Sequence, residues 1–194
     1  IKQSGTLTAS ADDTVVVKKG GRIMLTASSV NLTSGSRTVA RGAEGGGSVE
    51  IAAAKTVTVE QDAKVSVSAT ETGNGGTINI HADEKTTISG TLLAQGGKTA
   101  GDGGVINTTS NGVVQVTDTA VVKAGVRGAT GSVGSWNVTS GAFKADTTNA
   151  GVISASLNTN NVAIKVSSAG CAQTGNCSEA NNVIASAGLT QGQL

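Results

Sequence analysis

Three groups of acidic residues carry the side chains best suited to acid–base chemistry. They are Asp12-Asp13, Asp83-Glu84 and Asp102. Two carboxylates can cleave a glycosidic bond when they face each other across a cleft at a fixed separation. No spacing in this chain indicates such a pair, and neighbouring side chains in the polar bend ahead of Lys85 diverge. We therefore expect solvated turns, no catalytic residue and no enzyme; a polysaccharide-processing enzyme is a remote alternative.

The single histidine, His81, and one glycine-aspartate run are the candidates for metal chemistry. No spacing motif gives His81 the partners that a metal site or a nucleophilic triad requires, so we interpret it as a surface strand residue. Calcium-binding nonapeptides need tandem Gly-Gly-x-Gly-x-Asp. The run Gly101-Asp102-Gly103-Gly104 occurs once and in another order. The sequence predicts neither a metal nor a cofactor.

The composition excludes two classes of partner. The net charge is +1. The basic residues that lie closest together in the sequence are Lys18, Lys19 and Arg22, and we interpret them as part of a solvated turn. Nucleic-acid binding needs a clustered basic footprint and usually aromatic residues for stacking, and aromatic residues are 1% of this chain. No apolar run approaches the ~18 residues of a transmembrane helix. We expect no nucleic-acid partner and no membrane insertion.

The elements that position these residues are set by a repeat. Glycine pairs begin at residues 20, 46, 75 and 103, so successive pairs are 26, 29 and 28 residues apart. A fixed period in this range is typical of stacked-repeat folds. Each pair is followed by an alternating apolar run, such as Val49 with Ile51 or Ile78 with Ile80. Alternation with a period of two indicates half-buried strands rather than helices.

Three short strands per repeat predict an all-β fold, a right-handed parallel β-helix (solenoid), in which each strand pairs with its equivalent one coil later. Dividing the chain by the period gives about seven coils in a single segment, residues 1–194. We expect the glycine pairs to permit the backbone angles of a corner. The chain starts and stops within a pattern, which suggests a piece of a longer protein. The core candidates are Val49, Ile51, Val57, Val59, Val65 and Val67, with Ile78, Ile80, Ile88 and Leu92 stacked on them.

The region from Gly101 to about residue 185 resembles a known family. Gly103-Gly104-Val105, the valine-rich strand at residues 113–116, Ala124-Gly125, and the glycine-spaced loop that ends at Trp136 follow in a recurring order. The stretches 152–158 and 161–164 are similar to its following Leu-Asn and Asn-Val-x-Ile strand. This order resembles the filamentous haemagglutinin-like exoproteins of the two-partner secretion pathway.

The resemblance implies a secreted adhesin on the bacterial cell surface. It would act in virulence, bind a glycan or protein receptor on host cells or other bacteria, and be exported by an outer-membrane two-partner transporter. Polar loops on a rigid scaffold are where binding usually occurs, so we expect it in residues 34–47, 98–104 and 169–182. A passive stalk that carries a toxin or tip domain is the alternative. The binding candidates are Lys98, Asp102, Gln173 and Asn176.

Two kinds of covalent modification follow from the same resemblance. Cys171 and Cys177 enclose five residues, and in an exported protein so close a pair is readily oxidised to a disulfide. We expect a stapled loop on an outer corner, with a role in binding or anchoring as the alternative. Four Asn-x-Ser/Thr sequons make glycosylation a minor hypothesis, although chance alone gives nearly this number: Asn31, Asn107, Asn137 and Asn176.

Overall fold

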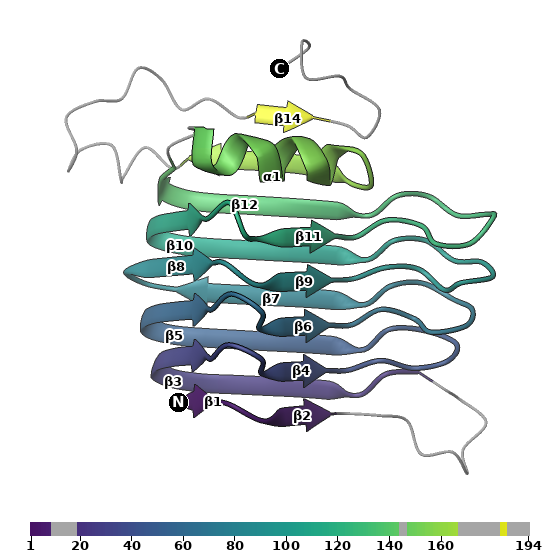
Figure 1. Ribbon diagram of the computed structural model, residues 1–194, viewed down its shortest axis with the longest axis horizontal. Coiled ribbons are helices and arrows are strands. Elements are labelled where there is room, and N and C mark those ends of the chain that lie inside the picture. The colour runs from purple at the N-terminus through teal and green to yellow at the C-terminus, as the bar shows by residue number, and fades with distance from the viewer. Residues whose placement is uncertain (9–18, 144–146, 167–182, 186–194) are drawn as a thin grey trace.

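The computed structural model describes residues 1–8, 19–143, 147–166 and 183–185, and these form a parallel β-solenoid of about five turns (Figure 1). The predicted parallel β-helix is confirmed. The strands form two sheets: a larger one, whose strands are 2 to 12 residues long, and a smaller one made of three-residue strands. Each coil from β1 to β11 contributes to both sheets.

The larger sheet contains β1 (Lys2–Gln3), β3 (Arg22–Leu32), β5 (Ser48–Val59), β7 (Thr77–Ala82), β8 (Lys85–Ile88), β10 (Val105–Val116), β12 (Ser135–Ala142), β13 (Asn161–Val166) and β14 (Val183–Ala185). The smaller sheet runs in the order β11 (Val121–Lys123), β9 (Thr91–Leu93), β6 (Lys64–Ser66), β4 (Arg37–Val39) and β2 (Thr6–Thr8). All of these strand pairs are parallel except β13 with β14.

The coil of β7, β8 and β9 displays the three short strands that the sequence predicts. In the coil below, the first two strands are joined into the single strand β5. Its residues pair with β7 up to Ala53 and with β8 from Thr56 onward, so β5 bends where β7 ends and β8 begins. The coil therefore has three faces, although two of them share one long strand in most turns.

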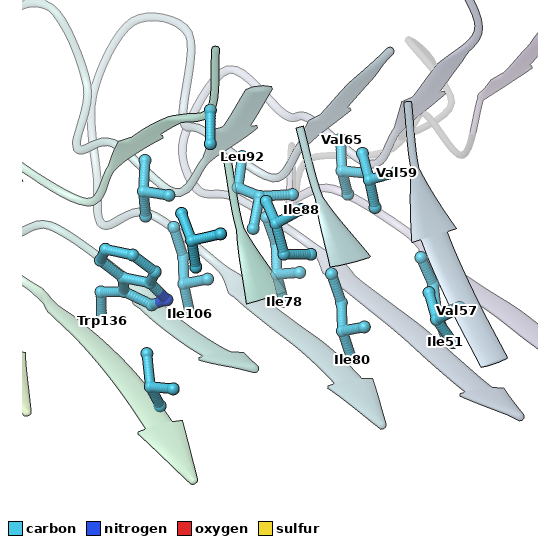
Figure 2. Close-up of a cluster of buried hydrophobic side chains, with 14 of the residues drawn as sticks. Ile51, Val57, Val59, Val65, Ile78, Ile80, Ile88, Leu92, Ile106 and Trp136 are labelled. Atoms are coloured by element: carbon cyan, nitrogen blue, oxygen red, sulfur yellow. The ribbon is translucent and has the colours of Figure 1, made fainter. Parts of the chain in front are cut away.

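The core consists of aliphatic columns that run from coil to coil, and all ten predicted core residues are buried. Val49 lies opposite Ile78, and Ile51 lies opposite Ile80, in the register that the period predicts. Figure 2 shows Ile78, Ile106 and Trp136 as successive members of one such column. Each Å² of apolar surface removed from water stabilises the fold by about 25 cal/mol, so these columns are the main source of stability.

The glycine pairs serve close packing, and the corner-angle interpretation is wrong. The described glycines with φ in the left-handed region are Gly35, Gly73, Gly101 and Gly131, and no paired glycine is among them. A Cβ on Gly76 would instead lie 1.9 Å from the carbonyl oxygen of Gly47 in the coil below. The motif recurs because backbone lies directly against backbone at this point of every coil.

The predicted seven coils exceed the observed number, because the last part of the described chain leaves the repeat. After β12 the chain forms helix α1 (Thr147–Leu157) where the earlier coils have a short strand. The all-β prediction did not include this helix, whereas the strand predicted at residues 161–164 is present as part of β13. The buried face of α1 contains two polar residues as well as three apolar ones: Asn149, Val152, Ile153, Ser156 and Leu157. A search for apolar residues at helical spacing therefore does not detect this helix.

Helix α1 covers the open edge of the smaller sheet at β11, with which it makes contacts. The Ser156 hydroxyl donates to the Val122 carbonyl oxygen over 3.2 Å. The Asn160 side-chain oxygen accepts from the Ala124 amide, also over 3.2 Å. Exposed strand edges invite pairing with other chains, and these two side chains satisfy that edge instead.

Candidate binding surface

Four connections between the two sheets stack into a ledge along one side of the solenoid. These loops, at residues 41–46, 68–75, 95–103 and 125–133, lie one above another at the right of Figure 1. We name them the loop ledge. Isolated parallel bridges join neighbouring loops, between Gly42 and Ala69 and between Thr72 and Ala100. The ledge is thus held in the same register as the strands.

Each ledge loop is closed at its base by one backbone hydrogen bond across the coil. The amide of the glycine that follows each loop donates to the carbonyl oxygen of the residue that follows the preceding short strand. The four bonds are Gly47 to Ala40 at 2.8 Å, Gly76 to Val67 at 2.8 Å, Gly104 to Ala94 at 2.6 Å and Gly134 to Ala124 at 2.8 Å. Since each glycine also packs against its neighbour's backbone, the loop bases form a rigid platform.

Two of the predicted binding residues, Lys98 and Asp102, lie in the third ledge loop. The Lys98 ammonium is 3.7 Å from a Glu71 carboxylate oxygen in the loop below, and both side chains are exposed. The Asp102 carboxylate accepts from the Ser132 amide at 2.7 Å, and its own amide donates to the Asn74 side chain at 2.9 Å. Lys98 is therefore available to a ligand, whereas Asp102 holds three loops in register.

Arg127 ties the ledge together across three loops. Its Nε donates to the Gly96 carbonyl oxygen at 2.8 Å, and its Nη2 donates to the Ala69 carbonyl oxygen. Burial is the main cause that lowers the pKa of Arg127; the charge of Arg41 adds to this, and Glu71 opposes it. The guanidinium thus links the fourth ledge loop to the third and the second.

Replacing Arg127 by methionine should lower the free energy of unfolding by about 1–3 kcal/mol, because two hydrogen bonds from a charged donor are lost. The matched control is Arg22→Met, which removes only the exposed ion pair with Glu50 and should cost at most about 1 kcal/mol. Urea unfolding followed by circular dichroism measures both. Equal losses in the two variants would show that Arg127 does not anchor the ledge.

The acidic groups are not brought together. Asp83 and Glu84 are exposed at the turn between β7 and β8, at the left of Figure 1, whereas Asp102 lies in the ledge at the right. Asp83 accepts from Asn111 at 2.8 Å and lies 3.2 Å from His81 Nε2. His81 is on β7, as expected for a surface strand, with its Nδ1 2.9 Å from the Thr109 hydroxyl. Asp12 and Asp13 lie outside the described residues.

Three sequon asparagines are described, and each lies on a strand with its amide nitrogen engaged. Asn107 donates to Asn79 at 2.7 Å and Asn137 donates to Asn107 at 2.9 Å, which makes an asparagine ladder over three coils. Asn31 donates to Glu60 at 2.7 Å, a bond that is the main cause of the lowered pKa of that carboxyl. Attachment of a glycan to any of these nitrogens would first require its bond to break.

Several predicted residues cannot be placed. Gln173, Asn176, Cys171 and Cys177, with the loop 169–182, lie outside the described part of the chain. The predicted loop 34–47 is not a single loop, because it contains β4. Its first part is a turn, and only residues 41–46 belong to the ledge.

No family model matches this chain, and a search of curated proteins found no relative. Within the described ranges, no helix is long and apolar enough to cross a membrane. In the same ranges, no three of the His, Cys, Asp and Glu side chains gather into a group that could hold a metal ion. The loop ledge is the candidate site because its stacked loops are held in register by parallel bridges and by the hydrogen bonds at their bases.

Proposed function

We propose that the chain is an adhesive segment of a secreted bacterial surface protein similar to the filamentous haemagglutinin-like exoproteins. Its partners would be a glycan or protein receptor on host cells or other bacteria, and an outer-membrane two-partner transporter during export. The order of motifs from Gly101 to Ile164 supports the family, and the β-solenoid fold is compatible with it. The ledge, with exposed Lys98 and Glu71, carries the argument for binding.

A ledge of stacked loops with ordered bases is well suited to adhesion. Stacked loops present many weak polar contacts in fixed register, and they lose little conformational entropy when they bind because their bases are already ordered. Recognition would spread along the rod rather than concentrate in a pocket. Repetition of similar loops from coil to coil also lets a repetitive ligand, such as a glycan chain, contact several loops at once.

A passive stalk is the second candidate, and one observation favours it. Binding hot spots are enriched in Trp, Tyr and Arg. The chain has one Trp and no Tyr, and Trp136 is fully buried. A stalk would hold a toxin or tip domain away from the cell and would need no surface aromatics.

The two candidates differ in what the isolated segment does. We expect the fluorescently labelled, folded segment to bind epithelial cells, or bacteria that display the parent protein, in a saturable manner that unlabelled segment competes. Circular dichroism and urea unfolding establish that the labelled protein is folded. Absence of saturable binding by the folded segment to either cell type would refute adhesion and favour the stalk.

A further inference from the structure

Four cations from three different coils gather where the smaller sheet meets the ledge. Arg37 lies on β4, Lys64 on β6, and Arg41 and Arg127 in the first and fourth ledge loops. We name these four residues the cation cluster. Lys64 is partly buried and the three arginines are exposed. They are 23 to 90 residues apart where they come from different coils, so only the coiling of the chain brings them together.

The first pair within the cluster is Arg37 with Lys64. These residues are register partners on adjacent parallel strands, and strands in a sheet are about 4.8 Å apart. Like charges directly opposite each other on a sheet are destabilising. The pKa of Lys64 is lowered. Burial is the main cause, and the charges of Arg41 and Arg37 add to it.

The second pair is Arg41 with Arg127. The Arg127 guanidinium reaches the Ala69 carbonyl oxygen, and Ala69 is bridged to Gly42, the neighbour of Arg41. The charge of Arg41 contributes to the lowered pKa of Arg127, which places the two cations within electrostatic reach of each other. The charge of Arg41 also contributes to the lowered pKa of Lys64, so the two pairs adjoin.

No carboxylate among the described residues forms an ion pair with a member of the cation cluster. The ion pairs in that part of the chain join Arg22 to Glu50, His81 to Asp83 and Lys98 to Glu71. The acidic side chain that acts on Arg127 is Glu71, which already has Lys98 as its partner. Stacked cations that repel one another and have no ion-pair partner among the described residues indicate a site that an anionic ligand completes.

We propose that the cation cluster binds a phosphorylated glycan, with one phosphate monoester at the Arg37–Lys64 pair and another at the Arg41–Arg127 pair. A phosphate monoester carries about −1.5 to −2 charges at neutral pH, which matches the +2 of each pair. A sulfate ester carries one charge and leaves each pair half compensated. Three of the four cations are arginines, whose planar guanidinium suits bidentate contact with phosphate. This inference rests on the proposed adhesive function for the source of the ligand and names its chemistry.

The test is binding of the folded segment to immobilised phosphomannan whose phosphates are monoesters, with the same mannan after removal of its phosphates as the matched surface. We expect saturable binding to the first and none to the second. The triple variant Arg37→Gln/Arg41→Gln/Lys64→Gln should bind at least about tenfold more weakly, which corresponds to 1.4 kcal/mol. The control Lys55→Gln/Lys85→Gln/Lys165→Gln removes the same charge from exposed positions of the larger sheet and should change affinity less than about threefold.

A pH series separates phosphate from other anions. The second pKa of a phosphate monoester is about 6, so binding to phosphomannan should weaken as the pH falls from 7 to 5. The groups that face the ligand are the four cations, with Glu71 as the acidic side chain that acts on Arg127. Binding to dextran sulfate should be weaker and should not fall over this range.

Three results would overturn the proposal. They are equal binding to the dephosphorylated mannan, equal losses in the cluster and control variants, and binding to dextran sulfate or DNA that is as tight as to phosphomannan with no pH dependence. The failure of this inference is distinguishable from that of adhesion. Saturable cell binding without phosphomannan binding removes the inference alone, whereas phosphomannan binding without cell binding removes adhesion alone.

Discussion

Replacing Gly76 by alanine should destabilise the solenoid by about 3 kcal/mol or more, which is at the upper end of the cost of overpacking. The added Cβ would lie 1.9 Å from the Gly47 carbonyl oxygen and 2.9 Å from the carbonyl carbons of Gly46 and Gly47. All three atoms belong to backbone that is locked in parallel pairing, so no side-chain rotation relieves the contact. The coils must separate locally, which also weakens the hydrogen bond from Gly76 to Val67.

The matched control is Gly151→Ala in helix α1. No atom lies within 4 Å of a Cβ built on Gly151, and alanine is favoured over glycine inside a helix by roughly 1 kcal/mol, so this variant should be more stable than the wild type. Urea unfolding of both variants, with the free energy extrapolated to water, gives the comparison. If Gly76→Ala were as stable as the wild type, close backbone packing could not be the reason for the repeated glycines.

Replacing Trp136 by alanine should cost about 3–5 kcal/mol, as for other buried aromatic residues. The indole is fully buried between Ile106 and Val162 in one column. Its Nε1 donates to the hydroxyl of Thr108 at 3.0 Å, and this buried threonine lies between Ile80 and Val138 in the adjacent column. Met24→Ala is the control, because Met24 is 53% exposed and its loss should cost under about 1 kcal/mol.

A double-mutant cycle separates packing from the hydrogen bond. Trp136→Phe keeps most of the ring but removes the donor, while Thr108→Val removes the acceptor and leaves the indole N–H without it. The double variant should be less damaging than the sum of the two single variants, by about 0.5–3 kcal/mol. Urea unfolding by circular dichroism measures all three, since the Phe variant lacks tryptophan fluorescence. Additive losses would show that the indole and the hydroxyl are not coupled.

The core could be predicted from the sequence because each coil repeats the same alternation of apolar and polar residues. The spacing of the glycine pairs sets the register, and the register places Ile78 above Val49 without any knowledge of loops. Their mechanical role could not be predicted, because corner angles and close backbone approach both select glycine. The exclusion of a Cβ by another coil is a property of the stack and leaves no local pattern.

The surface was less predictable than the core because its contacts join residues from different coils. Arg127 contacts Gly96 and Ala69, which lie 31 and 58 residues earlier in the chain. The cation cluster likewise combines residues from several coils, and the only sequence signal for it is that Arg37 and Lys64 are about one period apart. Helix α1 could not be predicted because its buried face includes the polar residues Asn149 and Ser156. Ser156 donates a hydrogen bond to the edge strand of the smaller sheet.

Adhesion through the ledge is tested most directly by cell binding of two folded variants compared with the wild type. The first removes exposed ledge side chains, Lys98→Ala/Thr99→Ala/Thr130→Ala, and the second removes exposed side chains of the larger sheet, Thr26→Ala/Gln115→Ala/Thr139→Ala. We expect the ledge variant to bind at least about tenfold more weakly, a loss of 1.4 kcal/mol, and the second to bind as the wild type does. Saturable binding that both variants retain in full would contradict a binding role for the ledge.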